Sequence, residues 1–254
     1  MRVAEVVGTD VVAVARGETC GEAARRMLER DVLGALVEPE PGESSPGIVT
    51  ARDLLELVGE GQDPATTPVS ACFTPEASTA APSWSLEHAA EAMLEGGFRH
   101  LVVVEDGRRL GVVSIRDIVR VWTRERVWRR AIQIREALET GFPTFSGAET
   151  VREAARGMAG HGVGAGLVQR APRARPRIVT ERDVLELMAA GGDPGAERVV
   201  DHLSKRMTYS APDWSLKQAA EAMIRGDFQY VVVVDPTGAL GILTMRDILR
   251  RWLD

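Results

Sequence analysis

The chain has 254 residues, of which 44% are hydrophobic and 27% charged, and a formal net charge of -6 at pH 7. This length allows one large domain or two of ordinary size, and the acidic balance argues against a general nucleic-acid-binding protein. The longest apolar runs have only the length of a strand, which excludes a membrane-spanning segment.

Four times along the chain, an apolar strand leads into a hydroxyl residue, one spacer residue, Arg and Asp. We call these four-residue motifs the tetrads; they begin at Thr50, Ser114, Thr180 and Thr244. The first matches the third and the second matches the fourth at an offset of 130 residues. Such a recurrence predicts a repeated ligand-binding element instead of a single catalytic centre.

In repeat one, a short lead-in strand precedes a helix that begins at the capping box Thr19-x-x-Glu22 and places Ala23, Ala24 and Met27 on one face. A strand at 35–37, a turn and a second apolar strand follow, and the tetrad opens a second helix. The other repeats show the same strand–helix–strand–strand–helix order. Their first hairpin strands are predicted at 101–104, 167–168 and 231–234, with further capping boxes at Thr150 and Ser215.

The hairpin loops differ between repeats. Repeats two and four have short turns at 105–107 and 235–238, whereas repeats one and three have longer loops that contain proline. The first long loop is acidic and the second, at 170–177, is basic. We expect both long loops to be mobile.

Residues 121–140 are predicted to form one helix that joins two modules, with the boundary near residue 128. Acidic residues lie among or beside its arginines, which favours a solvated helix with an apolar packing stripe over a nucleic-acid contact. The predicted domains are therefore 1–127, with repeats at about 1–62 and 66–125, and 128–254, with repeats at about 131–192 and 196–254.

The hairpin of repeat two carries a resemblance to a known family. Its strands, Phe-Arg-His-Leu-Val-Val-Val at 98–104 and Leu-Gly-Val-Val-Ser-Ile-Arg-Asp at 110–117, resemble the signature of the CBS (cystathionine-beta-synthase-type) motif. With four motifs in register, nearly the whole chain resembles two tandem CBS pairs. The resemblance implies an α/β (α+β) fold in which four β-α-β-β-α motifs pair into two modules that form a pseudo-symmetric disk. It also implies clefts between motifs that bind AMP, ADP, ATP or S-adenosylmethionine.

The tetrads suit a nucleotide on chemical grounds as well. A carboxylate accepts two hydrogen bonds, as the paired hydroxyls of a ribose require. The hydroxyl residue lies beside the amides of a helix start, which favour phosphate, and the arginine adds positive charge unless it pairs with an acid or points to solvent. The candidate ligand-binding residues are Thr50, Arg52, Asp53, Ser114, Arg116, Asp117, Thr180, Arg182, Asp183, Thr244, Arg246 and Asp247, with Arg99 and His100 at a strand entry.

A simpler interpretation of the tetrads stays open. A hydroxyl residue three positions before Asp, ahead of an apolar run, is also an ordinary capping box that needs no ligand. The two roles are compatible, since a cap that faces a cleft can also contact a ribose. For His100, an ordinary surface histidine is the alternative. Repeat three departs from the family pattern at Arg177, where glycine is usual, and we rank the sites of repeats two and four first.

Other signals are weaker. The glycine-rich segment 160–165 matches a dinucleotide fingerprint by residue type, but it follows a helix and enters a strand, so we predict a turn. The four histidines lack ligand spacing, and we expect no metal site apart from magnesium carried by a nucleotide. Cys20 and Cys72, the two cysteines, are expected to be reduced thiols, because the chain start does not resemble a secretion signal.

The sequence therefore predicts a cytoplasmic, non-catalytic regulatory protein that senses an adenosine-containing ligand and requires no fixed cofactor. We expect no membrane contact and no nucleic-acid partner, whereas a protein target and a homodimer stay open. The alternatives are a partner-binding scaffold with empty clefts and a nucleic-acid-associated regulator.

Overall fold

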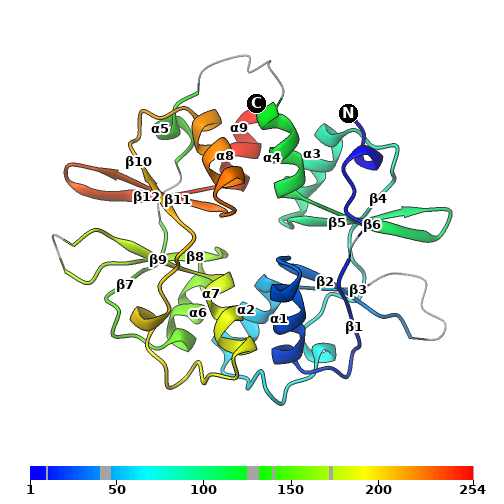
Figure 1. Cartoon of the computed structure of the whole chain (residues 1–254), viewed down its shortest axis with the longest axis horizontal. Coiled ribbons are helices and arrows are strands. Elements are labelled where there is room, and N and C mark those ends of the chain that lie inside the picture. The colour runs from blue at the N-terminus through cyan, green and yellow to red at the C-terminus, as the bar shows by residue number, and fades with distance from the viewer. Residues whose placement is uncertain (10, 41–46, 125–131, 139–140, 172–173, 254) are drawn as a thin grey trace. The chain divides into compact units, whose positions relative to one another are not determined.

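The computed structural model describes residues 1–9, 11–40, 47–124, 132–138, 141–171 and 174–253 (Figure 1). Within these residues, each of the four repeats forms its own three-stranded sheet with two helices. The predicted fold class, α+β with the order β-α-β-β-α in every repeat, is confirmed.

The elements follow the predicted order with small shifts at their ends. Repeat one comprises β1 (Ala13–Val14), α1 (Cys20–Glu29), β2 (Gly34–Val37), β3 (Gly47–Thr50) and α2 (Ala51–Glu60). Repeat two comprises β4 (Thr79–Ala80), α3 (Leu86–Gly96), β5 (His100–Glu105), β6 (Arg108–Ser114) and α4 (Ile115–Arg124). Repeat three comprises β7 (Thr144–Phe145), α6 (Val151–Gly160), β8 (Ala165–Val168), β9 (Arg177–Thr180) and α7 (Glu181–Ala189). Repeat four comprises β10 (Thr208–Ser210), α8 (Leu216–Arg225), β11 (Tyr230–Asp235), β12 (Gly238–Thr244) and α9 (Met245–Leu253).

The capping boxes predicted at the first helices are present. Thr19 accepts a hydrogen bond from the Glu22 N–H at 3.2 Å, and the Glu22 carboxylate accepts one from the Thr19 N–H at 2.9 Å. Thr150 and Ser215 cap α6 and α8 in the same way. The helix that each cap starts connects a strand to its parallel neighbour, and a hairpin then adds the third strand antiparallel.

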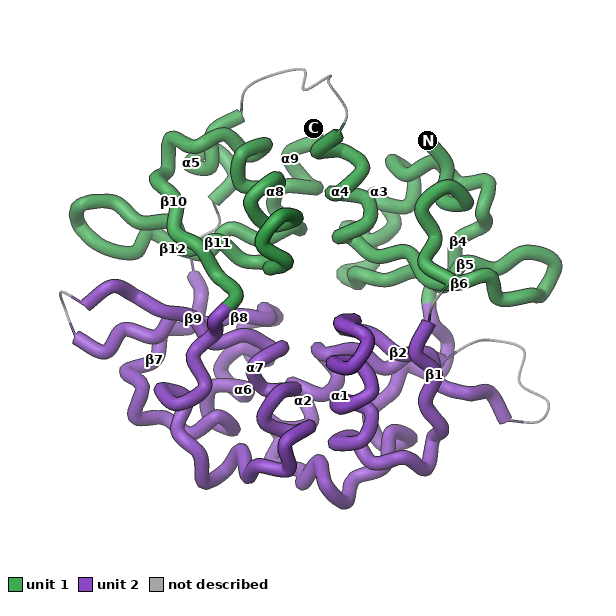
Figure 2. The backbone as a smooth tube through the Cα atoms, in the orientation of Figure 1, with its two compact units in different colours: residues 1–10, 78–140, 206–254 green, residues 11–77, 141–205 purple. Residues whose placement is uncertain are grey.

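The elements form two compact units, and each unit takes one repeat from each half of the duplication (Figure 2). Unit 1 comprises residues 1–10, 78–140 and 206–254, and unit 2 comprises 11–77 and 141–205. In unit 2, α1 packs on α7 and α2 packs on α6 around one apolar core; in unit 1, α4 packs on α8 and α9. The domains 1–127 and 128–254 stay a prediction, because their boundary lies outside the described residues.

Short helical turns precede the repeats and dock on a neighbour. They are η1 (Val3–Glu5), η2 (Val69–Ala71), α5 (Ile134–Ala137) and η3 (Val199–His202). The N–H of Val3, ahead of repeat one, donates to the Trp84 carbonyl before α3 at 2.9 Å. The N–H of Val69, ahead of repeat two, donates to the Glu18 carbonyl before α1 at 2.8 Å. Repeats one and two thus exchange lead-in turns.

Repeats three and four make the same exchange. The N–H of Ile134 in α5 donates to the Trp214 carbonyl before α8 at 2.8 Å, and the N–H of Val199 in η3 donates to the Glu149 carbonyl before α6 at 2.9 Å. Sequence analysis did not predict this exchange, because the apolar residues of the lead-in turns carry no sign of which helix they cover.

The single helix predicted over residues 121–140 is wrong. The structure describes helix α4 as far as Arg124, and Gln133 has an extended backbone (φ -87°, ψ 154°) before the single turn α5, so no one helix covers 121–140. Ile134 is fully buried, so its apolar side chain serves the lead-in contact and not the stripe of a longer helix. Residues 125–131, including Trp128, lie outside the described residues.

The glycine-rich segment at 160–165 is a turn, as predicted. Helix α6 ends at Gly160, Gly162 has a left-handed backbone (φ 66°), and β8 begins at Ala165. Residues 41–46 and 172–173 of the two long hairpin loops lie outside the described residues, and the mobility of these loops stays a prediction. No helix in the described part of the chain combines the length and apolar character needed to cross a bilayer.

Candidate functional site

In every tetrad the hydroxyl residue and the aspartate form a capping box at the start of the second helix. The backbone N–H and the hydroxyl of the first residue both donate to Oδ2 of the aspartate, at 2.6–3.0 Å and 2.6–2.8 Å respectively. The capping interpretation therefore holds in all four repeats. It occupies one carboxylate oxygen and leaves Oδ1 for other partners.

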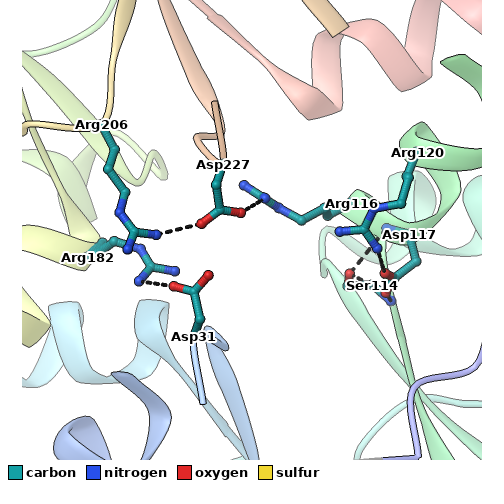
Figure 3. Close-up of polar contacts among 8 residues, drawn as sticks. All are labelled: Asp31, Ser114, Arg116, Asp117, Arg120, Arg182, Arg206 and Asp227. Atoms are coloured by element: carbon teal, nitrogen blue, oxygen red, sulfur yellow. Dashed lines mark hydrogen bonds and ion pairs between the residues drawn. The ribbon is translucent and has the colours of Figure 1, made fainter. Parts of the chain in front are cut away.

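The environment of the carboxylate differs between repeats. Oδ1 of Asp117 accepts from Arg120 at 2.9 Å (Figure 3). Asp183 is 7% exposed, also interacts with Ser204, and burial raises its pKa to about 6. Burial likewise raises the pKa of Asp247, which is 4% exposed. A bidentate contact between these aspartates and a ribose stays a prediction.

The tetrad arginines of unit 1 reach across to the other repeat of that unit. Arg116 of repeat two forms an ion pair with Asp227, which follows α8 of repeat four. Arg206 approaches the other oxygen of the same carboxylate at 2.5 Å, so Asp227 lies between two guanidinium groups (Figure 3). Arg246 of repeat four donates to the carbonyl of Gly97, which follows α3, at 2.6 Å.

The tetrad arginines of unit 2 follow the same plan. Arg182 of repeat three forms an ion pair with Asp31, which follows α1 of repeat one, at 2.8 Å (Figure 3). A Cβ at Gly162, which follows α6, would lie 3.7 Å from Nη2 of Arg52. Arg52 also lies 3.5 Å from Glu56 on its own helix.

The four targets of these arginines are equivalent residues. Each one follows the first helix of its repeat with a left-handed backbone, with φ of 52° at Asp31, 73° at Gly97, 66° at Gly162 and 53° at Asp227. Glycine adopts this conformation freely, whereas another residue is disfavoured there. Two repeats thus hold an acid in a position that suits glycine, and that acid neutralises a tetrad arginine. Sequence reasoning missed Asp31 and Asp227, although alignment of the helix ends pairs them with glycine.

Arg99 and His100 enter the hairpin of repeat two in unit 1. Arg99 Nη1 donates to the hydroxyl of Tyr230, the counterpart of His100 in repeat four, at 3.5 Å. His100 is half-buried opposite Ser114 in the hairpin, so it is not the ordinary surface histidine of the alternative. Burial, assisted by Arg99, lowers the pKa of His100 to about 3. The imidazole is therefore neutral at pH 7 and supplies hydrogen bonds but no positive charge.

The two units differ in charge at these strand entries. At the positions of Arg99 and His100, repeats one and three of unit 2 carry Leu33-Gly34 and Gly164-Ala165. Unit 1 therefore gathers more cationic and hydrogen-bonding side chains around its tetrads. Among the described residues, no three His, Cys, Asp or Glu side chains gather as they would around a metal ion.

Comparison with known proteins agrees with this geometry. The profile of the CBS domain matches residues 3–60, 69–124 and 199–254. The chain belongs to the CBS domain family. The CBS domain-containing protein YhcV of Bacillus subtilis is 32% identical over 117 residues, which cover 46% of this chain and 81% of that protein. The mitochondrial CBS domain-containing protein CBSX3 of Arabidopsis thaliana is 34% identical over 113 residues, 42% of this chain and 54% of that protein.

Among solved structures, protein MJ1225 from Methanocaldococcus jannaschii has a TM-score of 0.83 to this CBS chain. The sequences are 20% identical and the match covers 99% of both chains, so it shows a common fold. These comparisons indicate CBS domain proteins and no enzyme family.

Proposed function

We propose that this CBS domain protein is a non-catalytic regulator that binds an adenine nucleotide in unit 1. The observation that carries the proposal is Asp227, whose carboxylate lies between Arg116 and Arg206 beside the capped tetrad of repeat two. Two guanidinium groups on one carboxylate make a ready anion site. A nucleotide phosphate can take the place of that carboxylate, and the family resemblance supplies the expectation of an adenosine moiety.

Residues of repeat three form a fourth CBS motif in this proposal, although the family profile matches the other three repeats. Support comes from the shared element order in β7 to α7, the capping box at Thr150 and the tetrad cap at Thr180 and Asp183. Arg177 stands where the family usually has glycine. Its side chain donates to the carbonyl of Ser204, which follows η3, at 2.7 Å and so holds the lead-in turn of repeat four against repeat three.

Charge favours a phosphorylated ligand over S-adenosylmethionine. Asp117 and Asp247 would hold the ribose, while Arg116, Arg206 and Arg246 would hold phosphate. S-adenosylmethionine carries a sulfonium cation near its ribose, and the arginines would repel it. The neutral His100 would donate or accept a hydrogen bond. Magnesium is not required to neutralise the phosphates where arginines are present, but it can accompany ATP.

Calorimetric titration of the protein with AMP, ADP, ATP and S-adenosylmethionine tests the proposal. Asparagine variants are the sharpest probe, because an amide oxygen preserves the cap on Ser114 or Thr244 while the amide nitrogen faces the ribose as a donor. We expect at least one nucleotide to bind and the double variant Asp117→Asn/Asp247→Asn to lose affinity by roughly tenfold or more, as for the loss of one charged hydrogen bond.

The matched control is Asp53→Asn/Asp183→Asn, which makes the same replacement in unit 2 and leaves the unit 1 site intact. Absence of heat with every nucleotide, or equal affinity in the unit 1 double variant, would reject the proposal. A folded protein that binds none of the ligands would favour the scaffold alternative, in which the tetrads only cap helices. Titration with magnesium present and absent separates the nucleotide from its ion.

A further inference from the structure

Cys20 and Cys72 face each other in unit 2. Cys20 is the first residue of α1 and is fully buried, while Cys72 directly follows η2 and is half-buried. Their sulfur atoms lie 3.6 Å apart. Helix α1 and the η2 segment are also joined by the backbone, because the Cys20 N–H donates to the Thr67 carbonyl at 2.9 Å. The thiols therefore meet across the contact through which repeats one and two exchange lead-in turns.

The fold does not require thiols at these two positions. The first residue of the equivalent helices is Leu86, Val151 or Leu216, and the position of Cys72 is taken by Val6, Ala137 or His202. Three repeats thus make the same contact without sulfur. In the fourth such contact, between the start of α1 and the lead-in turn of repeat two, the two facing positions hold the two cysteines of the chain.

We propose that Cys20 and Cys72 are a redox-modification site, in which a reversible disulfide fixes the lead-in turn of repeat two to the first helix of repeat one. The oxidant is a low-molecular-weight disulfide such as oxidised glutathione. Cys72, the more accessible sulfur, exchanges with it to form a mixed disulfide and releases one thiol. Cys20 then attacks the Cys72 sulfur and releases the second thiol, so the protein loses two electrons and two protons and the oxidant gains them.

The surroundings of Cys20 suit the resolving step, whereas those of Cys72 make the first exchange slow, because the thiolate is the attacking species. A hydrogen bond from the Cys72 thiol lowers the pKa of Cys20, and the amino end of the ten-residue helix α1 also favours a thiolate there. The shared hydrogen bond and burial raise the pKa of Cys72. Cys20 is thus the better resolving nucleophile once Cys72 carries the mixed disulfide, and it is already within 3.6 Å of its target.

Bond formation would tighten a segment close to a tetrad. Closing the sulfur–sulfur distance to about 2 Å draws η2 toward α1. Two residues beyond Cys72, Thr74 pairs in both directions with Ile48 of β3, which leads into the tetrad at Thr50. The charge of Asp53 in that tetrad also contributes to the raised pKa of Cys72. Oxidation is therefore expected to shift β3 and the tetrad of repeat one.

The experiment equilibrates the full chain in glutathione buffers of increasing oxidised fraction and measures the melting temperature in each buffer. A second portion is quenched with acid and desalted for mass measurement and thiol titration. We expect an oxidised species lighter by two hydrogens, loss of both titratable thiols, a Cys20–Cys72 peptide link without reduction, and a Tm rise of roughly 5–10 °C. Dithiothreitol should reverse all four changes.

Cys72→Val and Cys20→Leu are matched controls, because Val6 and Leu86 hold the equivalent positions in other repeats. Both variants should stay folded and show no oxidised Tm shift. Stable glutathione adducts on separate cysteines, a link between two chains, or a link that forms only in urea would overturn the proposal. Two free thiols at every buffer ratio in the folded protein would also overturn it. None of these readouts depends on a nucleotide.

Discussion

Burial of the Asp183 carboxylate makes the free energy of unfolding depend on pH. It is 7% exposed, and the cap on Thr180 and the contact with Ser204 do not offset the desolvation that raises its pKa to about 6. Because an unfolded aspartate has a pKa near 3.9, the native state holds more protons than the unfolded state between these two values. The stabilising contribution is complete below about pH 4 and is lost as the pH rises through about 6.

Replacing Asp183 with asparagine should remove this pH dependence. We expect the free energy of unfolding of Asp183→Asn to rise relative to the wild type by about 1–3 kcal/mol between pH 4 and pH 7. Urea unfolding at pH 4, 5, 6 and 7 measures the difference. Asp53→Asn makes the same change in the half-exposed tetrad of repeat one and serves as the control for the cap. A difference that is constant over this pH range would contradict the expectation.

Asp227 should compete with an anionic ligand. In Asp227→Gly, Arg116 and Arg206 lose their common carboxylate, and glycine adopts the left-handed backbone of this position without steric cost. We expect nucleotide affinity to rise by roughly tenfold, which corresponds to about 1.4 kcal/mol. Stability should change by less than about 1 kcal/mol, since the backbone relief and the loss of the two ion pairs of the half-exposed Asp227 nearly cancel.

Calorimetry with ATP and thermal melting measure the two effects of Asp227→Gly. The reverse variant, Gly97→Asp, places an acid at the equivalent residue beside Arg246 and should weaken binding. Weaker binding in Asp227→Gly would mean that the acid positions Arg116 for the ligand instead of competing with it.

The exchanged lead-in turns depend on close backbone approach at the second hairpin strand. A Cβ at Gly111 in β6 would lie 2.1 Å from the Gly8 carbonyl oxygen, which accepts from the Val112 N–H. In repeat one, a Cβ at Gly47 would lie 2.8 Å from the Phe73 ring. Glycine at this position is therefore a packing requirement in repeats one and two, whereas repeat three has Arg177 there, which donates to the Ser204 carbonyl.

Gly111→Ala tests whether β6 needs glycine where it approaches Gly8. We expect a loss of about 2 kcal/mol in the free energy of unfolding, as for other overpacked sites, because backbone atoms must separate. Gly17→Ala is the control, since a Cβ there meets no atom within 4 Å. Hydrogen exchange at Gly8 and Val112 should increase in the Gly111 variant alone. Equal stability of the two variants would show that the segment around Gly8 moves aside without cost.

Local signals were enough to predict most elements and their caps. The capping boxes at Thr19 and Thr150, the hairpin strands and the helix after each tetrad follow from periodicity and hydrogen-bonding residues close in sequence. The arginine contacts with Asp31 and Asp227 join residues 151 and 111 positions apart, and no local pattern encodes them. The prediction of one helix over 121–140 failed for the same reason. Ile134 is apolar because it is buried at the start of α8, which is distant in the sequence.

On the scale of the whole molecule, each core is divided between the two halves of the sequence. Helices α1 and α2 of the first half pack on α7 and α6 of the second half in unit 2, and α4 packs on α8 and α9 in unit 1. Neither half of the chain contains a complete core. The predicted domains 1–127 and 128–254 are therefore expected to need each other, or a second copy of themselves, for burial of these helices.

Expressing the halves separately tests this dependence. We expect each fragment alone to self-associate or aggregate, and the mixture to form a one-to-one complex with the melting temperature close to that of the intact chain. Light scattering after size-exclusion chromatography and thermal melting measure both outcomes. Fragments that stay monomeric and folded, and do not combine on mixing, would show that the halves are independent domains.

The reciprocal docking of lead-in turns also limits how such a chain can change in length over evolution. Removing repeat two alone would strip the start of α1 of the segment at Val69 and leave the segment at Val3 without the start of α3. Deleting or copying one repeat therefore breaks lead-in contacts at two places, whereas deleting or copying repeats one and two together, or three and four together, leaves the lead-in contacts of the other couple intact. A gene that grew by tandem copying of couples would show its strongest internal similarity between alternate repeats, which is the pattern that this chain carries.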